Sequence, residues 1–113
     1  MMSSELVMTD RRDDILRHFE TLLGRWRGAR ARLWELSSSH ATLSILLTRD
    51  EGEGCLLIHC VSPTRIEAPR HWSHADIRVA TAEEVFDLID DAAGVRISNC
   101  GVEVKEHPKR PWD

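Results

Sequence analysis

The spacing of the apolar residues changes at Gly28, and this change limits the folds that the chain can adopt. Before Gly28, apolar side chains recur at helical intervals and form one continuous face: Ile15, Leu16, Phe19, Leu22, Leu23 and Trp26. After Gly28, apolar residues alternate with polar ones, which is typical of half-buried strands. The sequence therefore predicts a helix that begins near Thr9 or Asp10, both good N-cap residues, ends at Gly28 and is followed by a sheet.

Four segments after Gly28 have the alternation or the apolar character of strands: residues 29–36, 41–48, 55–61 and 75–80. The third of them is apolar on both faces, as expected of a central strand. Polar or glycine-bearing loops join the first three, so we expect an antiparallel meander. Pro63 and Pro69 flank residues 64–68, which are expected to form a short edge strand because proline cannot donate to a sheet ladder.

Residues 81–93 are predicted to form a second helix. Thr81 and Glu84 have the spacing of a capping box, and Gly94 is suited to the helix end. The apolar residues between them follow at helical intervals: Val85, Phe86, Leu88, Ile89 and Ala92. The acidic residues of the segment are then expected on the solvent-facing side of this helix.

A final hairpin is expected around residues 99–101, with strands at 95–98 and 102–105. Together these elements predict an α+β domain, in which an antiparallel sheet of about five to seven strands carries both helices on one face. Leu46 and Trp34 fall on the second face of their strands. An exposed apolar sheet face would favour a homodimer or a protein partner.

The length of 113 residues fits a single domain, which we place at residues 9–106, between a flexible arm at 1–8 and an extended tail at 107–113. The net charge of −4 argues against a general nucleic-acid coat or a membrane-surface protein. The sequence shows no signal-peptide pattern and no apolar run of about 20 residues. We therefore expect a cytoplasmic protein of bacterial type that does not bind membranes.

Residues 59–74 bring histidines, a cysteine and two prolines together, and they raise the question of a reactive site. Cys60, His71 and His74 are the candidates for a metal site or a thiol–imidazole pair. His59 and Cys60 are adjacent, so on a strand they point to opposite faces. The chain has no C-x-x-C pair, and its three cysteines show no repeated spacing, as expected of free thiols. A metal- or thiol-dependent enzyme is therefore an alternative interpretation, and no cofactor is expected.

Charge is distributed unevenly along the chain. Residues 83–91 carry five acids and no base, whereas residues 25–32 carry no acid and four arginines: Arg25, Arg27, Arg30 and Arg32. With Trp26 and Trp34 nearby, these arginines supply the ingredients of a platform for single-stranded nucleic acid, the second alternative. The overall negative charge and the lack of an RNP-type aromatic pattern make this less favoured than a protein partner.

The favoured interpretation is a non-catalytic protein-interaction or regulatory domain that self-associates and can neutralise a basic partner. Tryptophan and arginine are enriched among interface anchors, and prolines lower the entropy that a loop loses on docking. The candidate partner-binding residues come from the loop at 65–74 and from the acidic segment: Arg65, Arg70, His71, Trp72, His74, Asp87, Asp90 and Asp91.

Overall fold

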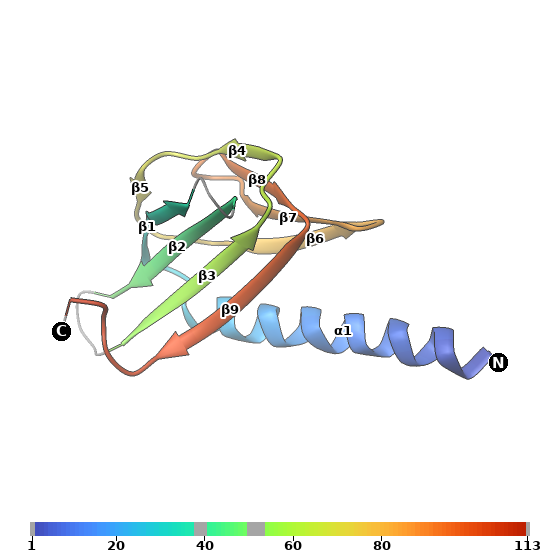
Figure 1. Ribbon diagram of the computed structural model, residues 1–113. Coiled ribbons are helices and arrows are strands. Elements are labelled where there is room, and N and C mark those ends of the chain that lie inside the picture. Colours follow the sequence, from blue (N-terminus) through green and yellow to red (C-terminus); the bar gives the residue numbers. More distant parts are fainter. Residues whose placement is uncertain (1, 38–40, 50–53, 113) are drawn as a thin grey trace.

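Two antiparallel sheets and one helix make up the described part of the chain (Figure 1). This computed structural model describes residues 2–37, 41–49 and 54–112, and within these ranges it describes the side chains from residue 14 onward. The elements are α1 (Met2–Arg25), β1 (Arg30–Ser37), β2 (Thr42–Thr48), β3 (Cys55–Val61), β4 (Arg65–Glu67), β5 (His71–Trp72), β6 (Arg78–Ala82), β7 (Val85–Asp90), β8 (Val95–Asn99) and β9 (Gly101–His107). Sheet 1 has the order β5-β1-β2-β3-β9, and sheet 2 has the order β4-β8-β7-β6. Residues of both sheets and of α1 form one shared hydrophobic core.

Helix α1 follows the predicted apolar face but begins earlier than expected. It starts at Met2, so residues 2–8, which we predicted to form an arm, belong to the helix. The residues of the C-terminal half are buried as their spacing predicts: Phe19, Leu22, Leu23 and Trp26. Ile15 is 49% exposed, and Figure 1 shows that the N-terminal part of α1 extends past the sheets. The helix exit lies at Gly28, whose φ of 89° favours glycine and whose N–H donates to the carbonyl of Ala75.

Sheet 1 contains the predicted meander. β1, β2 and β3 are antiparallel neighbours in chain order, and β9 lies on the other side of β3. The inward-facing residues of the meander are buried: Ala31, Leu43, Ile45, Leu47, Leu56, Ile58 and Cys60. The register of β1 shifts between Leu33 and Glu35, which leaves Trp34 as the extra residue of a β-bulge.

The second helix predicted at residues 81–93 is wrong, because this segment forms the β6–β7 hairpin and the turn after it. In strand geometry alternate residues of β7 share a face, and Phe86, Leu88 and Asp90 share the face of the core. Asp90 is accommodated there by a hydrogen bond from the indole of Trp72, a partner that local sequence does not reveal. The predicted single sheet with two helices on one face is therefore replaced by two sheets and one helix.

The turn between β6 and β7 provides a test of this correction. Glu83 has a φ of 57°, a conformation that costs a residue other than glycine about 1 kcal/mol or more. We expect Glu83→Gly to raise the free energy of unfolding, measured by urea denaturation, by about 0.5–1 kcal/mol. Glu84→Gly is the control: its φ is not positive, so glycine there should lower the free energy of unfolding by about 0.5 kcal/mol. A helix at 81–93 would make both substitutions destabilising.

The hairpin predicted around residues 99–101 is also wrong, although both of its strands exist. β8 pairs with β4 and β7 in sheet 2, whereas β9 pairs with β3 in sheet 1. The chain crosses between the sheets at Cys100, whose N–H donates to the carbonyl of Val61 over 3.0 Å. β4 is an edge strand of sheet 2, as the flanking prolines predict.

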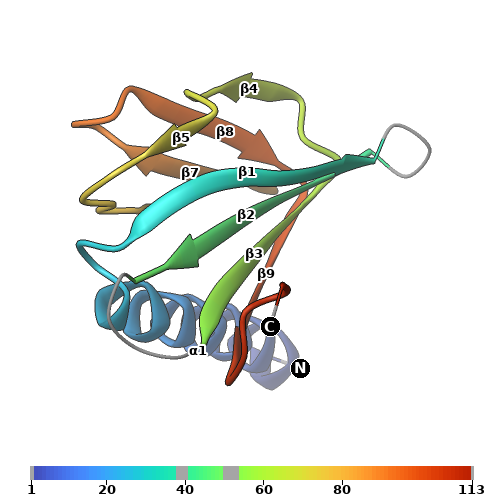
Figure 2. The ribbon, with the colours of Figure 1, turned by 90° about the vertical axis from the view of Figure 1, so that its left-hand side faces the viewer.

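The C-terminal tail, which we predicted to be extended, turns back over sheet 1 (Figure 2). The Sγ of Cys55 donates to the carbonyl of Lys109 over 3.6 Å, and the ring centroids of Trp34 and Trp112 are 6.0 Å apart. The tail therefore covers part of the outer face of sheet 1, the face that points away from the core. No helix in the described part of the chain is long and apolar enough to cross a membrane.

Candidate functional site

A cavity of about 450 Å³ lies beside β1 and β5, where the C-terminal tail meets sheet 1. The residues that give its lining a positive and aromatic character are Arg30, Arg32, Arg49, His71, Arg110 and Trp112, which we call the arginine site. None of the described residues that line this cavity is an aspartate or a glutamate. The arginine site is therefore a concave surface with four cationic side chains and no described counter-charge in its wall.

Four segments that are distant in sequence assemble the arginine site. The alternation of β1 places Arg30 and Arg32 on the outer face of sheet 1. β5 adds His71 as the cross-strand neighbour of Arg32. Arg49 follows the end of β2, and the tail contributes Arg110.

Two tryptophans hold the arginine side chains at the rim of the cavity. The guanidinium carbon of Arg32 lies 5.9 Å from the ring centroid of Trp34 and 5.5 Å from that of Trp112. Arg110 lies 5.7 Å from the centroid of Trp112, whose side chain is 50% exposed. Cation–π contacts at these distances orient a guanidinium group without neutralising its charge. The rings thus preorganise the positive charge for a ligand.

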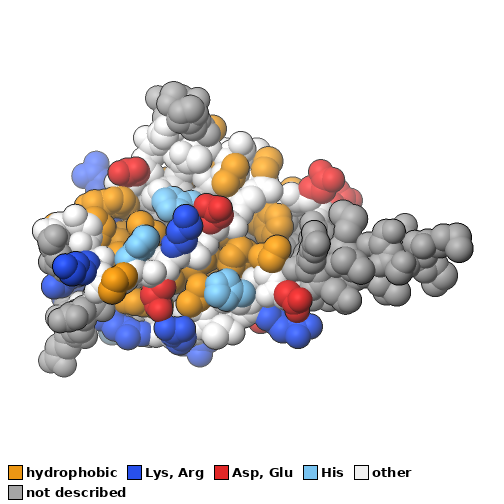
Figure 3. Space-filling view, turned by 60° about the horizontal axis from the view of Figure 1, so that its bottom comes forward, with side chains coloured by type: hydrophobic (Ala, Val, Ile, Leu, Met, Phe, Trp, Pro, Cys, Tyr) orange, Lys and Arg blue, Asp and Glu red, His pale blue; other side chains and the backbone are white. Residues whose placement is uncertain are grey.

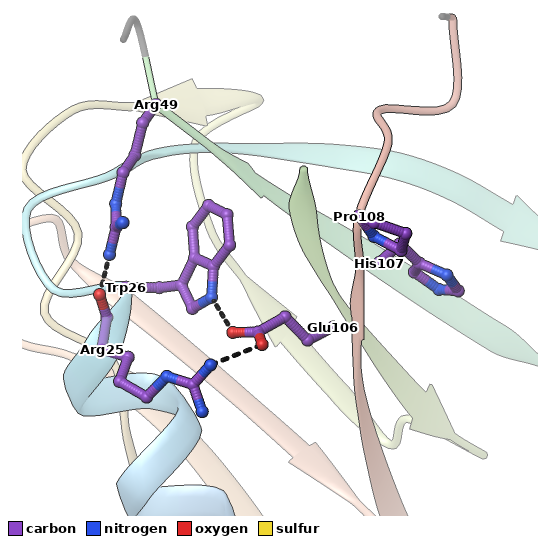
Figure 4. Close-up of a pocket in the computed structure, with 6 residues that line it drawn as sticks. All are labelled: Arg25, Trp26, Arg49, Glu106, His107 and Pro108. Carbon is purple, nitrogen blue, oxygen red and sulfur yellow. Dashed lines mark hydrogen bonds and ion pairs between the residues drawn. The ribbon is translucent and has the colours of Figure 1, made fainter. Parts of the chain in front are cut away.

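A second cavity has a volume of about 410 Å³ (Figure 4), and Arg49 lines both this cavity and the first. Glu106 accepts hydrogen bonds from the Nε1 of Trp26 over 2.7 Å and from Arg25 over 2.6 Å. Arg49 donates to the carbonyl of Arg25, and its guanidinium carbon lies 4.5 Å from the centroid of the Trp26 ring. Arg25 therefore compensates Glu106, the one carboxylate among the described residues that line this cavity, and Arg49 adds a further positive charge.

Other surfaces of the molecule carry both signs of charge. The underside of the molecule as drawn in Figure 1 shows histidines, basic side chains and acidic side chains interspersed among hydrophobic ones (Figure 3). The exposed positions of β9 include both Glu103 and Lys105. On sheet 2 the arginines are paired with acids, as in the ion pair between Arg96 and Asp87. The arginine site differs in composition, because its described lining contains four arginines and neither an aspartate nor a glutamate.

A polar row crosses the outer face of sheet 1. The Oγ of Ser44 lies 2.9 Å from the Nδ1 of His59, and Glu103 is the cross-strand neighbour of His59 on β9. Ser44 is buried, and neither of the two cavities is lined by these residues. The hydrogen bond therefore satisfies a buried hydroxyl group, and the row offers no open space for a substrate.

The structure separates the three residues considered for metal or thiol chemistry. Cys60 points into the core from β3, and burial raises the pKa of its thiol to about 12. His71 lies on the outer face of β5, which β1 and β2 separate from β3, while His74 follows β5 in an exposed position. Among the described residues, no group of three histidine, cysteine or carboxylate side chains is arranged to hold a metal ion. Cys60 therefore has neither access to solvent nor a nearby base at His71.

Thiol labelling tests this placement. With a pKa of about 12, the native Cys60 is protonated at neutral pH, and its thiolate fraction at pH 8 is about one in ten thousand. Cys55 is also buried, whereas Cys100 is exposed. Iodoacetamide at pH 8 is expected to modify Cys100 alone in the native protein and all three thiols in urea, as read by mass spectrometry. Native modification of Cys60 as fast as that of Cys100 would contradict the placement, and Cys100→Ala serves as the unlabelled control.

The loop at residues 65–74 does not present all of its predicted partner-binding residues to solvent. Trp72 is buried, and its Nε1 donates to Asp90 over 3.0 Å. Arg65 is exposed but forms an ion pair with Glu67. Of the partner-binding residues predicted in this loop, Arg70, His71 and His74 are exposed and have no ion pair described above. A protein partner for them and self-association of the chain stay predictions.

The acidic residues do not form a stripe on a helix. Asp90 is 1% exposed and accepts hydrogen bonds from Trp72 and from the backbone N–H of Asp76. Asp87 is half-buried on β7 and paired with an arginine of β8, and Asp91 is exposed in the turn that follows β7. Only Asp91 of these three therefore offers a largely exposed carboxylate.

Sequence reasoning missed the contribution of the tail and of Arg49. The sequence repeats one spacing, since Arg32 and Trp34 are two residues apart, as are Arg110 and Trp112. Strand alternation does not account for these pairs, because Trp34 lies in a β-bulge and residues 110–112 follow the last strand. The platform considered at residues 25–32 is also smaller than expected, because Trp26 belongs to the core.

Comparisons with protein-family models, curated proteins and solved structures found no match to this chain.

Proposed function

We propose that this protein is a non-catalytic binding domain for ligands that carry phosphate groups, and that the arginine site holds the phosphate. The observation that carries the proposal is the cavity wall, in which four arginines and a histidine gather with no described carboxylate. Guanidinium groups that line one cavity can donate several charge-assisted hydrogen bonds to a single anion. Several such donors favour a ligand with more than one negative charge.

Arginine suits this role because of its geometry. Its planar guanidinium group presents donors in a fork that matches two phosphate oxygens at once, and it stays charged at every physiological pH. Arg32 is held by the rings of Trp34 and Trp112, so its orientation is fixed before a ligand arrives. Preorganised donors lose less side-chain entropy on binding.

Recognition by this domain is expected to be local rather than long-range. The net charge of the chain is −4, so the protein as a whole does not attract anions. The positive field is confined to the cavity, where the low-dielectric wall strengthens it. Binding rather than catalysis is favoured because the lining supplies donors and rings, while the predicted nucleophile Cys60 lies in the core.

Calorimetric titration with inorganic pyrophosphate tests the proposal. We expect one binding event per chain, which weakens as salt rises from about 50 to 200 mM. The double substitution Arg32→Gln with Arg110→Gln is expected to lower the affinity at least about tenfold, since each lost charge-assisted hydrogen bond contributes roughly 1.5 kcal/mol or more. The matched control, Arg78→Gln with Arg96→Gln, removes two arginines of sheet 2 and should leave the affinity unchanged. Absence of binding, or equal affinity in both double variants, would overturn the proposal.

A further inference from the structure

We infer that the ligand of the arginine site is a single-stranded nucleic acid, whose backbone passes from the first cavity to the second over Arg49 while its bases stack on Trp112 and Trp34. This inference rests on the proposed function, because it assigns a chemical class to the phosphate-bearing ligand. It adds two requirements that a simple phosphate does not have. The ligand must repeat its phosphate groups, and it must carry flat aromatic faces.

The residue that the two cavities share, Arg49, supports a ligand with repeating phosphates. Their volumes are about 450 and about 410 Å³, and each lies in the range that holds one small molecule. Arg49 belongs to both walls and forms the bridge between them. A chain of nucleotides places a phosphate at each step along such a path, whereas a mononucleotide fills one cavity at most.

The exposed ring of Trp112 supports a ligand with aromatic faces. Trp112 is half exposed at the rim of the first cavity, and its ring makes contact with Arg32, Arg110 and Trp34. Proteins that bind single strands combine a positively charged groove with rings on which bases stack, and stacking tolerates every base because each has a π-face. The two arginine–tryptophan pairs, Arg32 with Trp34 and Arg110 with Trp112, provide both components side by side.

The geometry favours a single strand over a duplex. In a duplex the base faces are stacked on one another and are not available to Trp112. A duplex is also held by an extended basic surface, whereas the positive charge here lines cavities in an acidic protein. A flexible strand can enter both cavities and present its bases to the rings, so the inference is limited to single-stranded DNA or RNA.

Fluorescence anisotropy with labelled oligothymidylates of increasing length tests the inference on the full chain. The affinity is expected to rise at least about tenfold between a mononucleotide and an oligomer of roughly four nucleotides, and to rise little beyond that. Trp112→Ala, an exposed position, is expected to weaken oligomer binding about tenfold more than it weakens pyrophosphate binding. Arg78→Gln, on sheet 2 and paired with Asp91, is the control and should not change oligomer binding.

The outcomes separate the inference from the proposed function. If pyrophosphate binds at the arginine site but affinity does not rise with oligomer length, the inference is overturned and the proposed function stands. An equal loss of pyrophosphate and oligomer binding in Trp112→Ala overturns the stacking role, and with it the inference. A duplex that binds as tightly as the single strand of the same length also overturns it. If neither pyrophosphate nor any oligomer binds, both proposals fail.

Discussion

Asp90→Ala is expected to lower the free energy of unfolding by about 3 kcal/mol, a substantial fraction of the stability that a domain of this size possesses. Asp90 is 1% exposed, and it accepts hydrogen bonds from the Nε1 of Trp72 over 3.0 Å and from the N–H of Asp76 over 2.8 Å. Alanine removes the Oδ2 atom that accepts both bonds and leaves the buried indole donor of Trp72 unsatisfied. An unsatisfied buried donor costs about 1–3 kcal/mol, in addition to the lost bonds.

Two control substitutions make the Asp90 prediction specific. Asp90→Asn keeps an acceptor oxygen in place, so we expect less than half of the loss seen with alanine. Asp91→Ala changes the adjacent, exposed carboxylate and should stay within about 0.5 kcal/mol of the unmodified protein. Urea denaturation measures all three. If Asp90→Ala and Asp91→Ala had equal effects, Asp90 would not be the buried anchor of β5.

Trp26→Ala is expected to lower the free energy of unfolding by about 4 kcal/mol. The Trp26 ring is buried where α1 meets β9, and its indole N–H donates to Glu106 over 2.7 Å. The substitution leaves a cavity the size of an indole and also removes a hydrogen bond to a carboxylate. In this variant Glu106 keeps its ion pair with Arg25 but loses its hydrogen bond with Trp26. We therefore expect the contact between the end of α1 and β9 to be weaker than in the unmodified protein.

The contrast between two tryptophans tests this assignment. Trp26→Phe keeps most of the buried area and loses the hydrogen bond, so a loss of about 1–2 kcal/mol is expected. Trp112→Ala removes a half-exposed ring and should cost less than about 1 kcal/mol. Thermal and urea denaturation of the three variants check the order. A larger loss for Trp112→Ala than for Trp26→Ala would show that the tail, not the helix, closes the core.

The elements that could be predicted from the sequence are those whose apolar spacing fits only a helix or only a strand. The helical face that ends at Trp26 spans several turns, and a strand cannot produce its spacing. The alternation after Gly28 likewise fits a strand and not a helix. The meander of β1, β2 and β3 follows from the short loops between them. The start of α1 was not predictable, because residues 2–8 lack the apolar periodicity that marks a helix packed on a core.

The segment at residues 81–93 shows why other elements of the fold were harder to predict from the sequence. Leu88 fits a helical face with Val85 and Ile89, and it fits a strand face with Phe86, since the run is too short for the two periods to diverge. The residue that separates the two geometries is Asp90, which faces the core in the strand. A buried aspartate looks unfavourable in sequence until its partner is known, and that partner, Trp72, lies in a different element.

Local sequence patterns could not show which strands belong to the same sheet. β8 and β9 follow each other with one residue between them, as strands of a hairpin do, yet they join different sheets. The long-range pairing of β9 with β3 decides this, and no turn signal reports it. The arginine site was partly predictable for the same reason: Arg30 and Arg32 were evident on one strand face, but the approach of Arg110 and Trp112 depends on the fold of the tail.

The most direct test of the account is a ¹⁵N NMR titration of the protein with pyrophosphate, followed through backbone amides, arginine Nε–H groups and tryptophan indoles. The account predicts that the largest shifts fall on Arg30, Arg32, Arg110 and the indole of Trp112, while Arg78 and Arg96 of sheet 2 stay unchanged. Shifts that centre on sheet 2, or a spectrum that pyrophosphate leaves unaltered, would contradict the assignment of the arginine site as a phosphate-binding site.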